Sequence, residues 1–78
     1  PLPLYVSTAP TVAEMLDAAL KIVRRDPDGF FAVVEEEGTD NFGNNNNAVG
    51  AIEAVRRADA AIGVAMDYVR SQDPNTLV

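Results

Sequence analysis

Two stretches of the chain carry apolar residues at the three- and four-residue spacing of an amphipathic helix. The apolar positions of the first stretch are Val12, Met15, Leu16, Ala19, Ile22 and Val23. Thr11 and Glu14 form a capping-box pair, in which each side chain satisfies a backbone N–H of the first helical turn. We therefore expect a helix that begins at Thr11 and ends near Arg24 and Arg25, before a turn at residues 26–29.

The second periodic stretch predicts a longer helix from about Asn47 to about Gln72. Its apolar stripe consists of Ala51, Val55, Ala58, Ile62, Ala65 and Val69. Gly50 and Gly63 interrupt this stretch and each costs roughly 1 kcal/mol in an exposed helix, so we expect both to mark a close approach to a neighbouring element. Residues 44–47 are four consecutive asparagines, which are read either as the entry to this helix or as a polar lining of a site.

Between the two periodic stretches, residues 30–34 are five consecutive apolar residues without alternation. This run is too short for a helix and predicts a strand buried on both faces. The predicted fold class is therefore α/β, with an extended arm at residues 1–10 and a partial α/β segment at residues 11–78. Residues 76–78 resemble the start of another strand, so we expect a single fragment and not a complete domain.

The isolated strand also predicts a partner. Both rows of its backbone N–H and C=O groups need neighbours that the two helices cannot provide. We therefore expect self-association through strand edges.

Charge and composition argue against some classes of binding partner and limit the kind of metal ligand. The net charge of -6 and the pI near 4.2 argue against nucleic acid as a partner, because its phosphates would be repelled. No apolar run reaches the length of about 18 residues that a membrane span needs, so no membrane partner is expected. Cysteine and histidine are both absent, so any metal must be held by oxygen, which favours hard cations.

Candidate ligands follow the predicted strand at the end where open α/β folds collect their ligands. Glu35 is either a metal ligand or a solvated carboxylate at a strand end. Asp40 is either a ligand or the first residue of an Asx-turn. Glu36 and Glu37 are interpreted as an exposed acidic run.

Several short sequence motifs, here called phrases, occur along the chain in the order and spacing found in one known family. They are residues 11–15, residues 26–31, Val34 with Glu35, and residues 59–62. Together they give a resemblance to the alkaline phosphatase family over about residues 10–78. The resemblance implies a helix–strand–helix fragment of that family's three-layer α/β/α fold.

The same resemblance implies a ligand set with magnesium and zinc as cofactors. In the family, the residue matching Glu35 binds magnesium, the one matching Asp40 binds zinc, and a histidine at the position of Asn44 binds the same zinc. A carboxamide is a weak zinc donor. Asn44 therefore implies a harder ion such as magnesium or calcium, or a site that has lost its metal.

The function that the resemblance implies is hydrolysis of phosphoesters of small molecules by a periplasmic or secreted parent protein. The family's nucleophilic serine and its other ligands match no residue here, so the 78 residues alone should be inactive. The alternative is a non-catalytic homologue that serves as a binding or structural module. No substrate-binding residue can be assigned.

Overall fold

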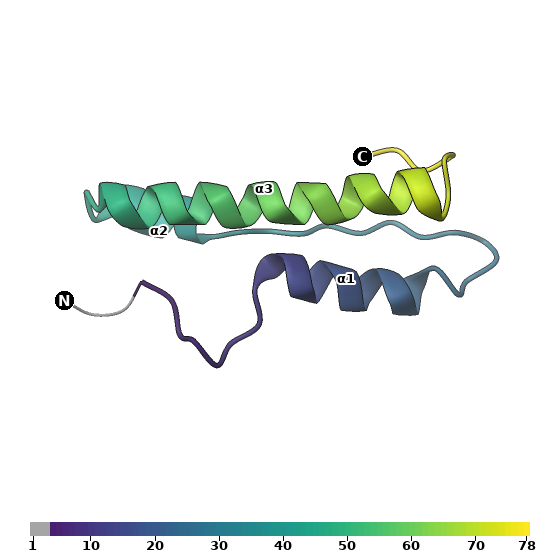
Figure 1. Cartoon of the computed structure of the whole chain (residues 1–78), viewed down its shortest axis with the longest axis horizontal. Helices are drawn as coiled ribbons and strands as arrows, with labels where there is room; N and C mark the ends of the chain where they lie inside the picture. The colour runs from purple at the N-terminus through teal and green to yellow at the C-terminus, as the bar shows by residue number, and fades with distance from the viewer. Residues whose placement is uncertain (1–3) are drawn as a thin grey trace.

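The computed structural model describes residues 4–78, and this part of the chain contains three helices (Figure 1). These are α1 (Val12–Val23), α2 (Gly38–Asn44) and α3 (Ala48–Ser71). Both helices expected from apolar periodicity are confirmed. Residues 1–3, the tip of the predicted arm, lie outside the described residues.

Helix α1 begins with the predicted capping box. The Glu14 backbone N–H donates to Thr11 Oγ1 at 3.1 Å, and the Thr11 backbone N–H donates to Glu14 Oε1 at 3.0 Å. After the helix, the Gly29 N–H donates to the Asp26 carbonyl at 3.2 Å, and Gly29 has a φ of +88°, which is accessible to glycine at low cost. The chain therefore reverses direction at the expected turn.

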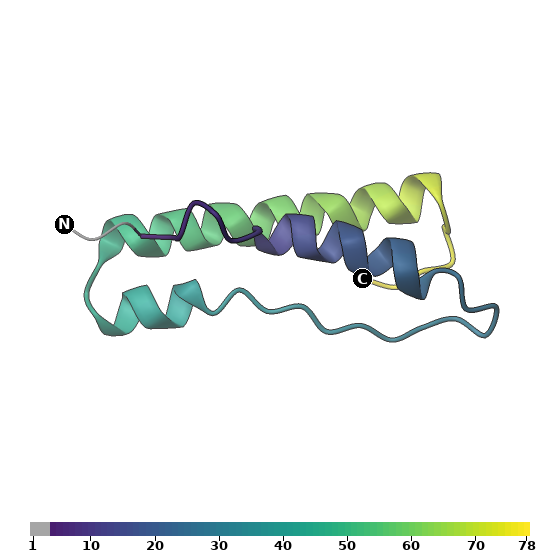
Figure 2. The same ribbon diagram turned by 90° about the horizontal axis from the view of Figure 1, so that it is seen from below.

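Helix α3 begins at an asparagine cap. Asn47 Oδ1 accepts a hydrogen bond from the Gly50 N–H at 3.0 Å, which confirms the helix-entry interpretation for this asparagine. Helices α1 and α3 run side by side in the same direction (Figures 1 and 2). Their carboxyl ends are joined by a hydrogen bond of 2.9 Å from Arg24 Nη1 to Gln72 Oε1.

The core lies between α1 and α3. Its buried residues are Val12, Leu16, Leu20 and Ala61, with Ala13, Val23, Val64, Ala65 and Tyr68 packed against them. Small alanines on α3 let the larger side chains of α1 approach its backbone closely. Burial of these apolar groups stabilises the helix pair.

The predicted α/β class is wrong for this chain. Residues 4–78 contain helices and no strand, and residues 30–36 form an extended segment between α1 and α2. A β-strand needs a neighbour to share its ladder of hydrogen bonds, and no backbone partner for residues 30–36 exists within the described range. The apolar run thus specifies an extended conformation but not a sheet.

The extended segment, residues 30–36, returns along the length of the helices (Figure 2). Its side chains alternate: Phe30 and Val34 are 37% and 46% exposed, whereas Phe31 and Val33 are 92% and 81% exposed. The more covered row faces the helices, where the Phe30 and Tyr68 rings meet edge to face at 6.0 Å. A largely apolar groove of about 750 Å³ lies between this segment, the two long helices and residues 76–78.

The described chain is elongated. It measures 46 × 23 × 18 Å and has a radius of gyration of 14.5 Å. A compact domain of this length would have a radius of about 11.5 Å. Much apolar surface therefore remains uncovered in the single chain.

Among residues 4–78, no helix has both the length and the apolar character that a bilayer crossing requires.

Candidate functional site

The predicted ligands lie in and just before α2. Glu35 is exposed near the end of the extended segment. Asp40 lies in the first turn of α2, and Asn44 is its last residue; both are exposed. All three oxygen-bearing side chains are therefore open to solvent.

Helix α2 was not predicted, since residues 38–44 carry no apolar periodicity. The N–H groups of Asp40 and Asn41 donate to the Glu37 carbonyl at 3.0 and 3.1 Å, which closes the first turn. A carboxylate such as Asp40 in this turn interacts favourably with the positive end of the helix dipole. The helix places Asp40 and Asn44 four residues apart, so their side chains share one face.

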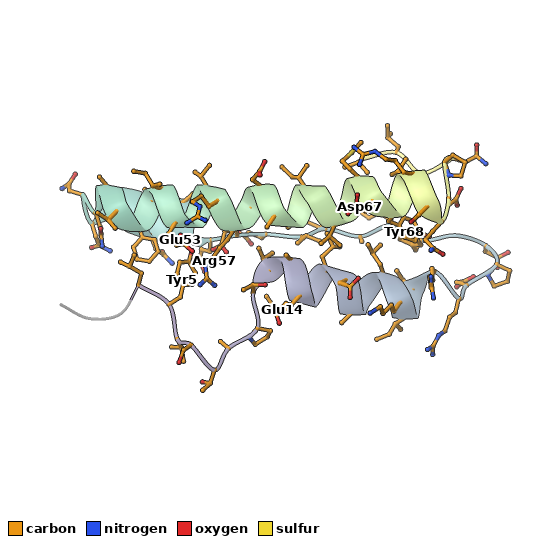
Figure 3. The ribbon with its side chains drawn as sticks, viewed as in Figure 1. Tyr5, Glu14, Glu53, Arg57, Asp67 and Tyr68 are labelled. Atoms are coloured by element: carbon orange, nitrogen blue, oxygen red, sulfur yellow. The ribbon has the colours of Figure 1, made fainter. Side chains whose placement is uncertain are left out.

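Next to these residues, the N-terminal arm meets α2 and α3 through a polar and aromatic cluster that consists of Tyr5, Glu36, Phe42, Glu53 and Arg57. Figure 3 labels Tyr5, Glu53 and Arg57 of this cluster. The Tyr5 hydroxyl donates to Glu36 Oε2 at 3.1 Å. The Arg57 guanidinium lies 3.7 Å from the centre of the Tyr5 ring, and Arg57 Nε pairs with Glu53 Oε1 at 3.3 Å. We call this group the Tyr5 cluster.

The environment of the Tyr5 cluster changes the acidity of its phenol. Burial raises the pKa of Tyr5, and the hydrogen bond to Glu36 raises it further because it favours the protonated phenol. The charges of Glu36 and Glu53 also raise the pKa of Tyr5, and the charge of Arg57 lowers it. The phenol is therefore held as a neutral donor to the Glu36 carboxylate.

The Tyr5 cluster contains residues that the sequence did not single out. Glu36 is half-buried and hydrogen bonded, so its assignment to an exposed acidic run was wrong. Arg57 was not among the predicted site residues, yet its guanidinium stacks on the Tyr5 ring. The one sequence feature that could have indicated this cluster was the tyrosine in the proline-rich arm. The arm has no periodic pattern that would indicate which residues this tyrosine contacts.

The described residues do not complete a metal centre by themselves. No group of three or more His, Cys, Asp or Glu side chains in residues 4–78 is arranged to hold a metal ion. The donors of Glu35, Asp40 and Asn44 are carboxylate and carboxamide oxygens, which suit magnesium or calcium. Zinc also accepts carboxylate oxygens, but these three residues supply none of the nitrogen or sulfur ligands that hold it in most sites.

Sequence comparison places the chain among the phosphatases. A family model described as alkaline phosphatase matches residues 5–78. The chain belongs to the alkaline phosphatase family, which confirms the resemblance inferred from its phrases. No solved structure matches the chain with significance.

Individual relatives give the same result. Alkaline phosphatase 3 of Bacillus subtilis is 35% identical over 69 residues, which cover 88% of this chain and 15% of the relative. The human tissue-nonspecific isozyme is 35% identical over 71 residues, or 91% of this chain and 14% of the relative. The alkaline phosphatase of Escherichia fergusonii is 33% identical over 78 residues, which cover 100% of this chain and 16% of the relative. The chain thus spans about 15% of the length of these curated relatives.

Proposed function

We propose that these 78 residues are a segment of a longer metal-dependent hydrolase that cleaves phosphomonoesters of small molecules. The observation that carries this proposal is the family match over residues 5–78, which includes the acidic stretch from Glu35 to Asp40. By the same family relation, we place the longer protein in the periplasm or outside the cell.

We further propose that Glu35 and Asp40, with Asn44 as a weaker third donor, supply part of the ligand set for magnesium. Asp40 and Asn44 share one face of α2, and Glu35 precedes that helix by a few residues. A bound divalent cation would neutralise phosphoryl oxygens as charge develops on them. Further ligands would come from other parts of the longer protein.

The 78-residue chain alone should not hydrolyse phosphoesters. By the family resemblance, the nucleophilic serine and the remaining metal ligands match no residue of the chain, and phosphoryl transfer needs a nucleophile and the stabilising cations held together in one geometry. The test is release of p-nitrophenol from p-nitrophenyl phosphate with magnesium present, measured for the chain and for buffer. Turnover above the buffer rate would contradict this expectation.

The metal assignment is tested by calorimetric titration of the chain with Mg²⁺. The double variant Glu35→Gln with Asp40→Asn should bind Mg²⁺ more weakly, because both carboxylates lose their charge. Glu37→Gln is the matched control, since Glu37 is an exposed carboxylate of the same run. Equal affinity in the double variant and this control would remove both residues from the site.

Asn44 favours a second candidate function, that of a non-catalytic binding or structural homologue. The family's zinc-binding imidazole is replaced here by an amide, so one cation site is weakened. The longer protein distinguishes the two functions. A folded longer protein that shows no turnover with phosphomonoesters at any Mg²⁺ concentration would support the non-catalytic function.

We also propose that the isolated chain self-associates through the free edges of residues 30–34. Support comes from the exposed Phe31 and Val33 and from the lack of backbone partners for this segment within residues 4–78. Exposed apolar patches beside unpaired backbone are typical association surfaces.

A further inference from the structure

We propose that Tyr5 is a positioning residue for the stretch that carries Glu35 and Asp40. Tyr5 contacts α3 and holds Glu36 by a hydrogen bond. Through Glu36 it also holds the first turn of α2 beside α3. The consequence for metal binding rests on the proposed function, whereas the mechanical role of Tyr5 does not.

The first step is a shared oxygen atom. Glu36 Oε2 accepts a hydrogen bond from the Tyr5 hydroxyl at 3.1 Å and another from the Gly38 backbone N–H at 2.9 Å. Gly38 is the first residue of α2, and the N–H groups of a first turn have no partner within their own helix. The carboxylate that accepts from the first N–H of this helix is therefore itself held by the phenol.

The second step is the anchoring of the Tyr5 ring. Arg57 of α3 lies 3.7 Å from the ring centre, in a cation–π contact, and is kept in place by its 3.3 Å pair with Glu53. Phe42 of α2 meets the same ring at 5.6 Å in an edge-to-face arrangement. Tyr5 thus joins α2 and α3, and Figure 3 shows it between the arm and α3, beside Arg57 and Glu53.

The third step is the lack of space at Gly38. A Cβ atom there would collide with the Tyr5 hydroxyl and would lie 2.9 Å from Glu36 Oε2 and 3.0 Å from the Cβ of Ala54. Ala54 belongs to α3 and is 0% exposed. The start of α2 is therefore enclosed by α3 on one side and by the phenol on another.

These contacts hold Glu36 and Gly38, which lie between the two candidate ligands in the sequence. Glu35 directly precedes the residue that Tyr5 holds, and Asp40 lies in the turn whose first N–H donates to Glu36. Losing the phenol donor should leave both carboxylates on a mobile stretch. Positioning of ligands before the metal arrives reduces the entropy cost of binding.

The experiment compares Tyr5→Phe and Gly38→Ala with the unaltered 78-residue chain. Tyr68→Phe is the control for loss of a phenol, and Gly43→Ala is the control within α2, because no atom lies within 4 Å of its added Cβ. Hydrogen exchange at the amides of Gly38 and Asn41 reports the anchoring of the helix. Mg²⁺ affinity, measured by titration, reports its effect on the ligands.

We expect Tyr5→Phe to speed exchange at these amides by about fivefold, as for the loss of one hydrogen bond, and to weaken Mg²⁺ binding by a similar factor. Gly38→Ala should act in the same direction, Tyr68→Phe should match the unaltered chain, and Gly43→Ala should not speed exchange, because alanine favours the helix. Unchanged exchange in Tyr5→Phe would overturn the proposal. If the unaltered chain shows no response to Mg²⁺, the metal role of Glu35 and Asp40 fails, and the exchange rates still decide the role of Tyr5.

Discussion

A phenol that donates to a carboxylate must keep its proton, which makes the arm contact of Tyr5 sensitive to alkali. Because the folded pKa of Tyr5 is raised, its contribution to stability is complete below the ordinary phenol pKa of about 10. It is lost as the pH rises through the raised pKa. Glu36, Glu53 and Arg57 are the charged groups that face the phenol.

We therefore expect Tyr5 to titrate above the ordinary phenol range in an ultraviolet absorbance titration of the folded chain. That transition should vanish in Tyr5→Phe and persist in Tyr68→Phe. If Tyr5 titrates within the ordinary phenol range near pH 10, its hydrogen bond to Glu36 does not form in solution.

Also at the scale of single residues, the capping box of α1 gives a second prediction. Thr11→Ala should lower the stability of the helix pair by about 1 kcal/mol, because an N–H of the first turn loses its acceptor. Thermal unfolding followed by circular dichroism measures this change. Thr8→Ala, at an exposed threonine of the arm, should leave the unfolding curve unchanged. Equal curves for the two variants would contradict a role for the cap.

The same cap lowers the pKa of Glu14, first through the hydrogen bond from the Thr11 backbone N–H and then through the Thr11 hydroxyl contact. A lowered carboxyl pKa contributes stability that is present above the ordinary value and lost as the pH falls through the folded value. Glu14→Gln should therefore reduce the loss of α1 helicity on acidification. Identical acid titrations of helicity in the variant and the unaltered chain would count against this linkage.

At the scale of elements, the packing of α2 on α3 depends on Gly50. A Cβ at Gly50 would collide with the Phe42 ring, which confirms that this glycine permits a close approach. The expectation for Gly63 was wrong, since its added Cβ would have no neighbour within 4 Å. Gly50→Ala should therefore destabilise the chain by about 1–3 kcal/mol through overpacking.

Gly63→Ala is the matched control and should stabilise the chain by up to about 1 kcal/mol, because alanine favours the helix interior. Urea unfolding of both variants and the unaltered chain measures the two effects. Stabilisation by both substitutions would mean that α2 does not rest on α3 in solution.

Secondary-structure elements were predictable from the sequence where a local pattern of residues specifies them. The capping box at Thr11 and the long apolar stripes indicated α1 and α3 directly. Helix α2 has only seven residues, with two glycines and two asparagines, and is held by contacts of Phe42 with Gly50 and Tyr5. The apolar run at residues 30–34 indicated an extended backbone, but a ladder requires a neighbour that no local pattern contains.

At the scale of the whole molecule, the candidate site was only partly predictable. Glu35 and Asp40 were chosen as candidate ligands from their position after an apolar run and from the family resemblance. The contact that holds them, from Tyr5 to Glu36, joins residues 31 positions apart in the sequence. Such a pairing follows from the packing of the arm on α3, and no spacing rule indicates it.

The elongated shape and the uncovered apolar row predict how the isolated chain behaves in solution. Phe31 and Val33 point away from the helices, and each would contribute about 1.5–3 kcal/mol if fully buried between two copies. Replacing both by threonine keeps the extended backbone but removes most of this apolar area, so self-association should weaken by at least about tenfold.

Sedimentation velocity over a concentration series measures the association of this double variant. Val49→Thr is the matched control, since Val49 is 69% exposed but lies on α3 and not on the extended segment. The control should associate like the unaltered chain. If the unaltered chain, the double variant and the control are monomers at every concentration, residues 30–34 do not pair between copies in water. The proposed association would then be wrong.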